Sequence, residues 1–459
     1  MKTIRQIPLL IGFALLVAFS ALPAAAPAKT DTLTWNRTKD AMDADVRDLG
    51  LIPLLKRIAH ETGWHVYVEP VAGFKASTRF TGLPTSQALR RLLGDMNFAI
   101  VPQTNGTSRL YVFQSSRNNA TQRVSAAPSE ARRVPRELVI RAREGTDVEA
   151  LAKQLGAKIV GHIPELNAYR FEFESEEALE TARKLLAANP GIASVQDNFY
   201  VDPPDLPQSL NGMVAPEGKL TLDPPKADAC KVIVGFVDTA LQPMGEQYEP
   251  FIKERVSLTG QSSADNSSPT HATAMVNAYF QALRASGRTS SSVPIISVDV
   301  FGGGDAANTF NVAKGMILAA NKGATVINAS LGGYGDSGLL RDAVKQLAAH
   351  NIPVFAAVGN DASRSAFFPA AYPEVISVTA LERGQVAPYA NLGTTPDVAT
   401  PGAVLFNYNG MTYGARGTSV SSAAATGIAA GLADANCAPW TTVIPAIEKN
   451  LPVPGTPAK

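Results

Sequence analysis

The carboxyl-terminal half of the chain alternates short apolar runs with helical patterns, and this alternation constrains the fold more than any other feature. The runs expected to form strands are 231–237, 294–300, 324–328, 354–358 and 375–379. Helical patterns begin at His271, Phe310, Gly338 and Ser419. Such a sequence predicts an α/β domain with a doubly wound, mostly parallel sheet that is buried on both faces. Functional groups in these sheets gather at the carboxyl ends of the strands.

Four polar residues stand at the ends of these elements. Asp238 and Asn360 follow apolar strands, whereas His271 and Ser419 open helices. A serine hydroxyl needs a base to remove its proton, and a carboxylate can hold an imidazole base in one tautomer. A side-chain amide beside the serine N–H can bind an oxyanion. The pattern therefore predicts four roles in acyl transfer. Ser419 is the expected nucleophile and His271 the general base. Asp238 is the expected orienting carboxylate and Asn360 the oxyanion donor.

Each of these residues, taken singly, also fits a structural role. An Asp or Asn after a strand is commonly a turn residue, and a Ser or Thr before a helix is commonly an N-cap. The order and spacing of the four residues together favour the catalytic interpretation over four separate structural roles. The other four histidines have no comparable partner motif; they are His60, His65, His162 and His350.

Residues 230–435 resemble the subtilisin-like serine proteases. The fragments that carry the likeness, in family order, are Val-Asp-Thr (237–239), His-x-Thr (271–273), Val-Ile-Asn-Ala-Ser-Leu-Gly (326–332), Val-Gly-Asn (358–360), Tyr-Pro-Glu-Val-Ile-Ser-Val (372–378) and Gly-Thr-Ser (417–419). The resemblance implies a pocket, for the residue before the scissile bond, that is lined by Ser330, Leu331, Gly332, Ala357, Val358 and Gly359. It also implies that Phe301 and Gly302 offer an edge to an extended substrate.

Three positions depart from the family pattern. Ala240 and Ala272 stand where the family usually has Gly, and Ala423 stands where it usually has Pro. Alanine disfavours a positive φ, but no reacting group is lost. The sequence therefore predicts an exported serine endopeptidase that acts on peptide or protein substrates. The alternative is a non-catalytic envelope binding protein on a degenerate protease fold, and a third reading is an esterase on the same triad.

Composition and the amino terminus indicate an exported globular protein. The 41 basic and 40 acidic residues create no net field that would recruit nucleic acid or an anionic membrane. Residues 1–28 have the build of a signal peptide: Lys2 and Arg5 precede an apolar run and a small-residue segment. The run is too short for a convincing span, so no transmembrane anchor is expected after signal removal. No zinc-type cluster and no carboxylate-rich calcium loop occur, so no metal or cofactor is expected.

Two small α+β modules are expected before the catalytic domain, which we place at 227–459. Residues 32–114 have a βαββαβ-like pattern that is similar to the short N-terminal domain of secretins and TonB-dependent transducers. This likeness implies a Gram-negative envelope, with a periplasmic or secreted protein and a possible envelope protein contact. Residues 135–202 have a ferredoxin-like pattern. They resemble the inhibitory propeptide of subtilisin-like proteases in Glu-Leu-Val-Ile (137–140), Tyr-Arg-Phe (169–171) and Gln-Asp-Asn (196–198).

Two linkers separate these units. Residues 115–134 are polar and are expected to be flexible. Residues 203–226 are rich in proline and are expected to be extended and poor in strands. Because the ferredoxin-like module directly precedes this second linker, we expect self-processing there. Bonds next to proline make poor substrates, which favours 208–214 or 217–223 as the place of cleavage.

Cys230 and Cys437 are the only cysteines, and their spacing predicts a disulfide. A strand from Cys230 to Asp238 would span roughly 26 Å, and a helix from Ser419 to Cys437 would span roughly 27 Å. If Asp238 and Ser419 meet at one edge of the sheet, both cysteines arrive at the opposite edge. The alternative is two separate buried thiols.

Overall fold

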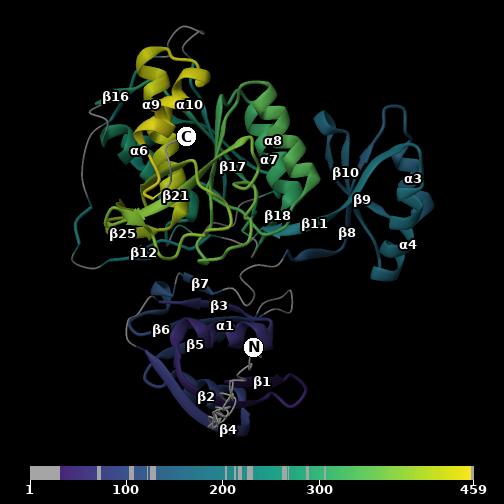
Figure 1. Ribbon diagram of the computed structural model, residues 1–459, viewed down its shortest axis with the longest axis vertical. Coiled ribbons are helices and arrows are strands. Elements are labelled where there is room, and N and C mark those ends of the chain that lie inside the picture. The colour runs from purple at the N-terminus through teal and green to yellow at the C-terminus, as the bar shows by residue number, and fades with distance from the viewer. Residues whose placement is uncertain are drawn as a thin grey trace, which may run out of the picture.

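The computed structural model describes residues 31–69, 74–102, 108–120, 122–124, 131–201, 204–210, 213–215, 220–224, 231–260, 266, 268–285, 289–303 and 306–455. Figure 1 shows three bodies along the chain. They are a first module (31–124), a second module (131–201) and a carboxyl-terminal domain (220–455). The predicted signal peptide, residues 1–28, lies outside the described residues. Among the described helices, none is long and apolar enough to cross a membrane.

The first module contains two small sheets and two helices. One sheet has the order β1-β2-β4 and the other the order β5-β6-β3-β7. The elements are β1 (Thr32–Asn36), β2 (Ala41–Gly50), α1 (Leu51–Thr62), β3 (His65–Val68), β4 (Lys75–Pro84), α2 (Thr85–Leu93), β5 (Asn97–Val101), β6 (Arg109–Phe113), η1 (Arg117–Asn119) and β7 (Gln122–Val124). Leucines of both helices form the core between the sheets; Leu54, Leu55 and Leu89 are fully buried. Because β7 pairs with β3, the module extends into the predicted linker 115–134 and past the predicted end at 114.

The second module has the ferredoxin-like arrangement that its pattern predicts. Its sheet has the order β11-β8-β10-β9, with two helices on one face. The elements are β8 (Arg133–Ala142), α3 (Val148–Leu155), β9 (Lys158–Ile163), η2 (Pro164–Leu166), β10 (Ala168–Glu172), α4 (Glu176–Ala187) and β11 (Ile192–Val201). Asp147 and Ser175 cap the two helices by accepting hydrogen bonds from the N–H groups of Ala150 and Ala178.

The carboxyl-terminal domain is built on the expected doubly wound sheet. Its order is β15-β17-β14-β19-β20-β21-β22, with β23 also paired to β21, and only the β21–β22 pair is antiparallel. The strands are β14 (Val234–Asp238), β15 (Ile252–Ser257), β17 (Ile295–Asp299), β19 (Val326–Ala329), β20 (Val354–Ala357), β21 (Val375–Glu382), β22 (Gln385–Val386) and β23 (Val398–Pro401). The strands β14, β17, β19, β20 and β21 consist largely of buried apolar residues, as a sheet covered on both faces requires.

Helices cover both faces of this sheet, as Figure 1 shows. On one face, α6 (His271–Ala285), α9 (Thr418–Asn436) and α10 (Trp440–Asn450) share an apolar core with the strands. On the other face, α7 (Thr309–Asn321) and α8 (Gly338–Ala349) form a second core. The remaining elements are short: β12 (Gln208–Ser209), β13 (Thr221–Leu222), α5 (Gly245–Tyr248), η4 (Glu249–Phe251), β16 (Ser290–Ser291), β18 (Ala307–Asn308), β24 (Ala403–Tyr408) and β25 (Met411–Arg416).

The linker predicted at 203–226 is more structured than expected. β12 adds to the hairpin formed by β24 and β25, and β13 pairs with β16 in the parallel sense. Leu220 is buried in the core beneath α6 and α9. The carboxyl-terminal domain therefore begins its packing before the predicted boundary at 227, because one apolar side chain of the linker finds a place in that core.

Candidate active site

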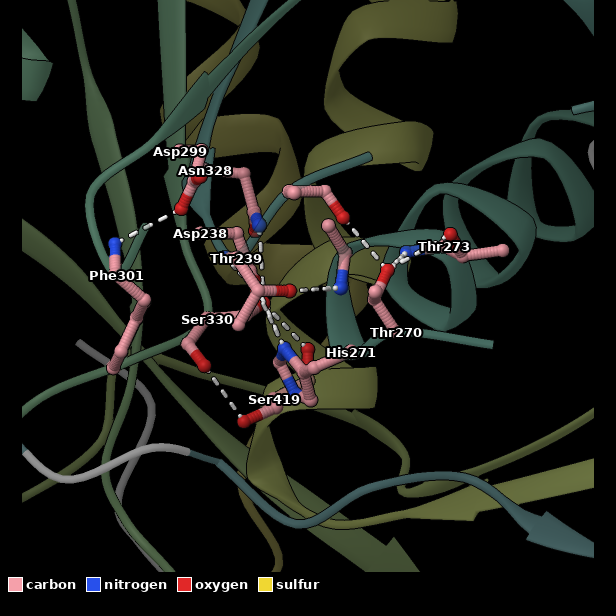
Figure 2. A network of polar contacts seen from close by, with 12 residues as sticks. Asp238, Thr239, Thr270, His271, Thr273, Asp299, Phe301, Asn328, Ser330 and Ser419 are labelled. Atoms are coloured by element: carbon pink, nitrogen blue, oxygen red, sulfur yellow. Dashed lines mark hydrogen bonds and ion pairs between the residues drawn. The ribbon is translucent and has the colours of Figure 1, made fainter. Parts of the chain in front are cut away.

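Asp238 and His271 form a buried pair at the carboxyl edge of the sheet. Asp238 is the last residue of β14, and His271 is the first residue of α6. His271 Nδ1 lies 2.8 Å from Asp238 Oδ1 and 3.0 Å from Oδ2 (Figure 2). The carboxylate is fully buried and the imidazole is 2% exposed. This geometry requires the proton on Nδ1 and leaves Nε2 as the acceptor.

The backbone around this pair is held by threonine. Thr239 N donates to Asp238 Oδ1 at 2.6 Å, and Thr239 Oγ1 accepts from Ala272 N at 3.0 Å. Neither Ala240 nor Ala272 has a positive φ. The two alanines that replace the usual glycines therefore adopt backbone conformations open to any residue, and the pair forms without strain at either position.

Ser419 opens α9 directly beside the imidazole in Figure 2. Its hydroxyl donates to the carbonyl oxygen of Ser330 at 2.9 Å, and the Ser330 hydroxyl donates to the Ser419 carbonyl at 2.8 Å. No hydrogen bond joins Ser419 Oγ to the His271 ring, although both residues are described. Since Ser419 lies in the first turn of a helix, its N–H lacks an intrahelical partner. The hydroxyl and the N–H thus stand together at the start of α9.

Asn360 lies against the same helix start. Its Oδ1 accepts hydrogen bonds from the N–H and the hydroxyl of Thr418, both at 2.9 Å. This fixes the side-chain amide so that the NH₂ group remains as the donor. Gly417 has φ 145°, and a Cβ placed there would lie 2.8 Å from Asn360 Nδ2. Only glycine allows this close approach.

Sequence reasoning missed the residue that ties these parts together, Asn328. It is fully buried on β19 and donates to Ser330 Oγ at 3.0 Å. Its Oδ1 accepts from Ser422 Oγ at 3.0 Å and from Thr426 Oγ1 at 3.2 Å, both on α9. A buried amide must be hydrogen-bonded. The signal in the sequence is an asparagine in an otherwise apolar strand.

A cavity of about 310 Å³ contains Ser419 and most of the predicted site. Its walls include Ser330, Leu331, Gly332, Ala357, Gly359 and Asn360. Val358, Phe301 and Gly302 are not among the lining residues. Val358 packs into the core. The loop of Phe301 and Gly302 is instead held by Asp299, whose Oδ1 accepts from both N–H groups at 2.9 Å.

The protein's own chain crosses this cavity. Tyr200 and Val201 of β11 pair with β18, which follows the predicted edge residues Phe301 and Gly302 in the chain. Farther along the chain, β12 pairs with β25. Between these two anchors, Pro204 and Asp205 line the cavity together with Ser419. The first module adds a further wall, which consists of Ile52, Lys56 and Val124.

Two sequence predictions concern cysteines and metals. Cys437 is bonded in a disulfide, whereas Cys230 lies outside the described residues, so the pairing of the two stays a prediction. Among the described residues, no group of three or more His, Cys, Asp or Glu side chains is arranged to hold a metal ion.

Comparison with known families places two segments of the chain. The model of the Subtilase family matches residues 229–448, and the model of the Fervidolysin N-terminal prodomain matches residues 119–198. Both ranges begin at or after residue 119. The likeness of the first module to the short N-terminal domain of secretins and TonB-dependent transducers therefore stays a prediction.

Individual relatives agree with these matches. Subtilisin Savinase of Lederbergia lenta is 30% identical over 168 residues, which are 36% of this chain and 62% of that protein. Fervidolysin of Fervidobacterium pennivorans is 27% identical over 255 residues, which are 47% of this chain and 36% of that protein. The crystal structure of fervidolysin, described as a keratinolytic enzyme related to subtilisin, has a TM-score of 0.52 at 20% identity, covering 68% of this chain and 57% of the other. The chain thus matches less than two thirds of the length of these relatives, and the structural likeness establishes the fold.

Proposed function

Residues 229–448 match the model of the Subtilase family, and on this premise we propose that the chain is the precursor of an exported serine endopeptidase. The observation that carries the proposal is the arrangement in one place of a buried Asp238–His271 pair, a serine at a helix start and an oriented amide. These are the kinds of group that acyl transfer needs. The predicted signal peptide supports export, and the first module supports a contact with another envelope protein.

We propose the following reaction for these groups. As a peptide enters, the Ser419 hydroxyl turns from the Ser330 carbonyl toward His271 Nε2 and attacks the scissile carbonyl carbon. The imidazole takes the hydroxyl proton, while Asp238 stabilises the imidazolium that forms. The tetrahedral oxyanion accepts hydrogen bonds from the Asn360 NH₂ group and the Ser419 N–H. The imidazolium then protonates the leaving amine, and a water molecule releases the acyl group from Ser419 by the same steps.

Labelling with a fluorophosphonate tests the nucleophile. We expect the processed protein to be labelled once, at Ser419, and the Ser419→Ala variant to remain unlabelled. Ser421→Ala is the matched control, because Ser421 is a buried serine of the same helix whose hydroxyl donates to the Thr400 carbonyl, away from the imidazole. Absence of labelling in the processed wild type would favour the alternative, a non-catalytic binding protein.

Self-processing forms the second part of the proposal. Pro204 and Asp205, which lie between β11 and β12 along the chain, line the same cavity as Ser419. We therefore place the cut at one of the two bonds that flank Asp205. This position precedes the two intervals that proline content alone favours. It is supported by the pairing of β11 with β18 and of β12 with β25, because Pro204 and Asp205 between them line the cavity. The second module would then act as an inhibitory propeptide.

A further inference from the structure

The cavity beside Ser419 is closed at one end by an aromatic side chain. Its two walls are backbone segments that contain Gly332 and Gly359. The half-buried ring of Phe367 lies between these glycines. A Cβ placed at Gly332 would lie 2.4 Å from Phe367 Cε1, and a Cβ placed at Gly359 would lie 3.2 Å from Phe367 Cδ1. The ring therefore fills the space between the walls.

The position of this ring is fixed by its neighbours. Tyr334 meets Phe367 edge to face, with ring centroids 5.2 Å apart. The hydroxyl of Tyr334 donates to Asp361 Oδ2 at 2.8 Å and accepts from Asn391 Nδ2 at 3.2 Å. The next residue along the chain, Phe368, exchanges two backbone hydrogen bonds with Gly333, at 2.7 and 2.9 Å. Both the ring and its backbone are thus tied to the wall, and a bound side chain cannot easily displace them.

We propose that Phe367 limits the residue directly before the cleaved bond to a small side chain, such as alanine, serine or glycine. This inference rests on the proposed function and names the substrate class of that site. A large aromatic or branched side chain would need the space that the Phe367 ring occupies. Pro204 and Asp205, the residues of the chain's own linker that line the cavity, carry no aromatic or β-branched side chain.

Two tetrapeptide anilides that differ only in the last residue, alanine or phenylalanine, test the inference on the processed wild type. We expect kcat/KM to favour the alanine peptide by about 100-fold or more, since one methylene too many in a tight pocket already costs 10–200-fold. Phe367→Ala should raise the ratio of phenylalanine to alanine turnover by about 100-fold. Phe367→Leu, which keeps part of the volume, should give an intermediate ratio and guards against a misfolded alanine variant.

The outcomes separate the two proposals. Equal turnover of both peptides by the wild type, or an unchanged ratio in both Phe367 variants while Ser419 still reacts with a fluorophosphonate, would refute the pocket inference and leave the protease standing. A wild type that neither turns over a peptide nor reacts with the fluorophosphonate would refute the proposed function, and the inference with it.

Discussion

The two amino-terminal modules both lie against the carboxyl-terminal domain, but they contact different parts of it. The second module reaches the starts of two helices. Gln196 Oε1 accepts from Leu339 N at 2.9 Å in the first turn of α8, and Asn198 Oδ1 accepts from Phe310 N at 3.1 Å in the first turn of α7. Because first-turn N–H groups have no intrahelical partner, these amides complete both helices.

Further contacts make the second module's interface specific. Asn198 is fully buried, and its NH₂ group donates to Glu137 Oε2 at 2.7 Å within the module. Arg141 forms an ion pair with Asp342 of α8. The Phe199 ring packs directly on Gly335, where a Cβ would lie 2.3 Å from Phe199 Cγ.

The first module reaches the cavity rim and the linker. Ile52, Lys56 and Val124 line the cavity that also contains Ser419, and Asn119 Oδ1 accepts from Ser209 Oγ at 3.3 Å. A parallel sheet must form many pairings between distant residues, which makes its folding slow. Contacts that complete helices on that sheet can assist its folding, whereas contacts at a cavity rim can only cover it. We therefore expect the second module to serve folding and the first module to serve access to the cleft.

Deletion of each module in turn tests this difference in role, and it has the largest expected effect. Removal of 131–201 should abolish nearly all recovery of active protein, because the helix starts of α7 and α8 then lose their partners. Removal of residues 31–124 should leave most of the recovery of active protein unchanged. Active-site titration of the soluble protein with a fluorophosphonate measures both. Comparable losses from the two deletions would show that the modules do not differ in this way.

Asn360→Ala should slow the proposed cleavage beside Asp205, which separates both modules from the carboxyl-terminal domain. Loss of one oxyanion donor should lower kcat by roughly 10²–10³. The precursor should then persist with both modules attached, which a time course of precursor mass would reveal. Processing at the wild-type rate would remove Asn360 from the reaction.

Asn198→Ala should weaken the hold of the second module after the cut. The substitution leaves Phe310 N without its side-chain acceptor and removes the amide donor to Glu137 Oε2, which costs about 1–3 kcal/mol. Release of the cut fragment should accelerate by about 10–100-fold, at 1.4 kcal/mol per tenfold. Surface-based dissociation measurements with a tagged fragment can follow this. Asn119→Ala is the matched control in the first module, and an equal acceleration there would contradict the comparison.

The stability of the first module should depend on pH through the carboxyl group of Glu69. Burial alone would raise the pKa of Glu69, but hydrogen bonds from Ser115 and Gln114 outweigh it and hold the pKa below its usual value. A lowered folded pKa contributes stability that is present above the unfolded pKa, about 4.3, and is lost as the pH falls through the folded pKa. Glu69→Gln should remove this dependence and cost about 2 kcal/mol at neutral pH.

The contact of Trp35 with Trp64 reports on this module, because their ring centroids are 5.6 Å apart and the third tryptophan of the chain, Trp440, lies in α10. Near-UV circular dichroism of the uncleaved Ser419→Ala precursor, with Trp440→Phe added, should lose the signal of this pair in acid. The same acid midpoint with and without Glu69 would rule out its contribution.

Sequence patterns located five strands and the four long helices of the carboxyl-terminal domain because each is a local signal, but they did not locate β15, β23, the β24–β25 hairpin or α10. Apolar runs that end at Asp238 and near Asn360 predicted both strands and the edge of the sheet at which these two side chains lie. The helices and strands of the second module were predicted from the same kind of pattern. The placement of these residues is as expected, while their roles stay predictions. Local patterns also located both helices of the first module.

Contacts between distant residues were not predictable in this way. The pairing of β11 with β18 joins segments more than 100 residues apart, and it anchors the chain shortly before the linker residues that line the cavity with Ser419. Asn328 meets its partners Ser422 and Thr426 only after α9 packs on the sheet. β7 is three residues long, too short to show a periodicity of its own.

Above all, we propose that Ser419 cuts its own chain beside Asp205. The most direct measurement is the mass of the mature protein made from the wild type and from Ser419→Ala in a host that lacks other envelope proteases. We predict a wild-type product that begins at Asp205 or Leu206, and a Ser419→Ala protein that keeps both modules. Trimming of both proteins to the same product, or of neither, would contradict the account.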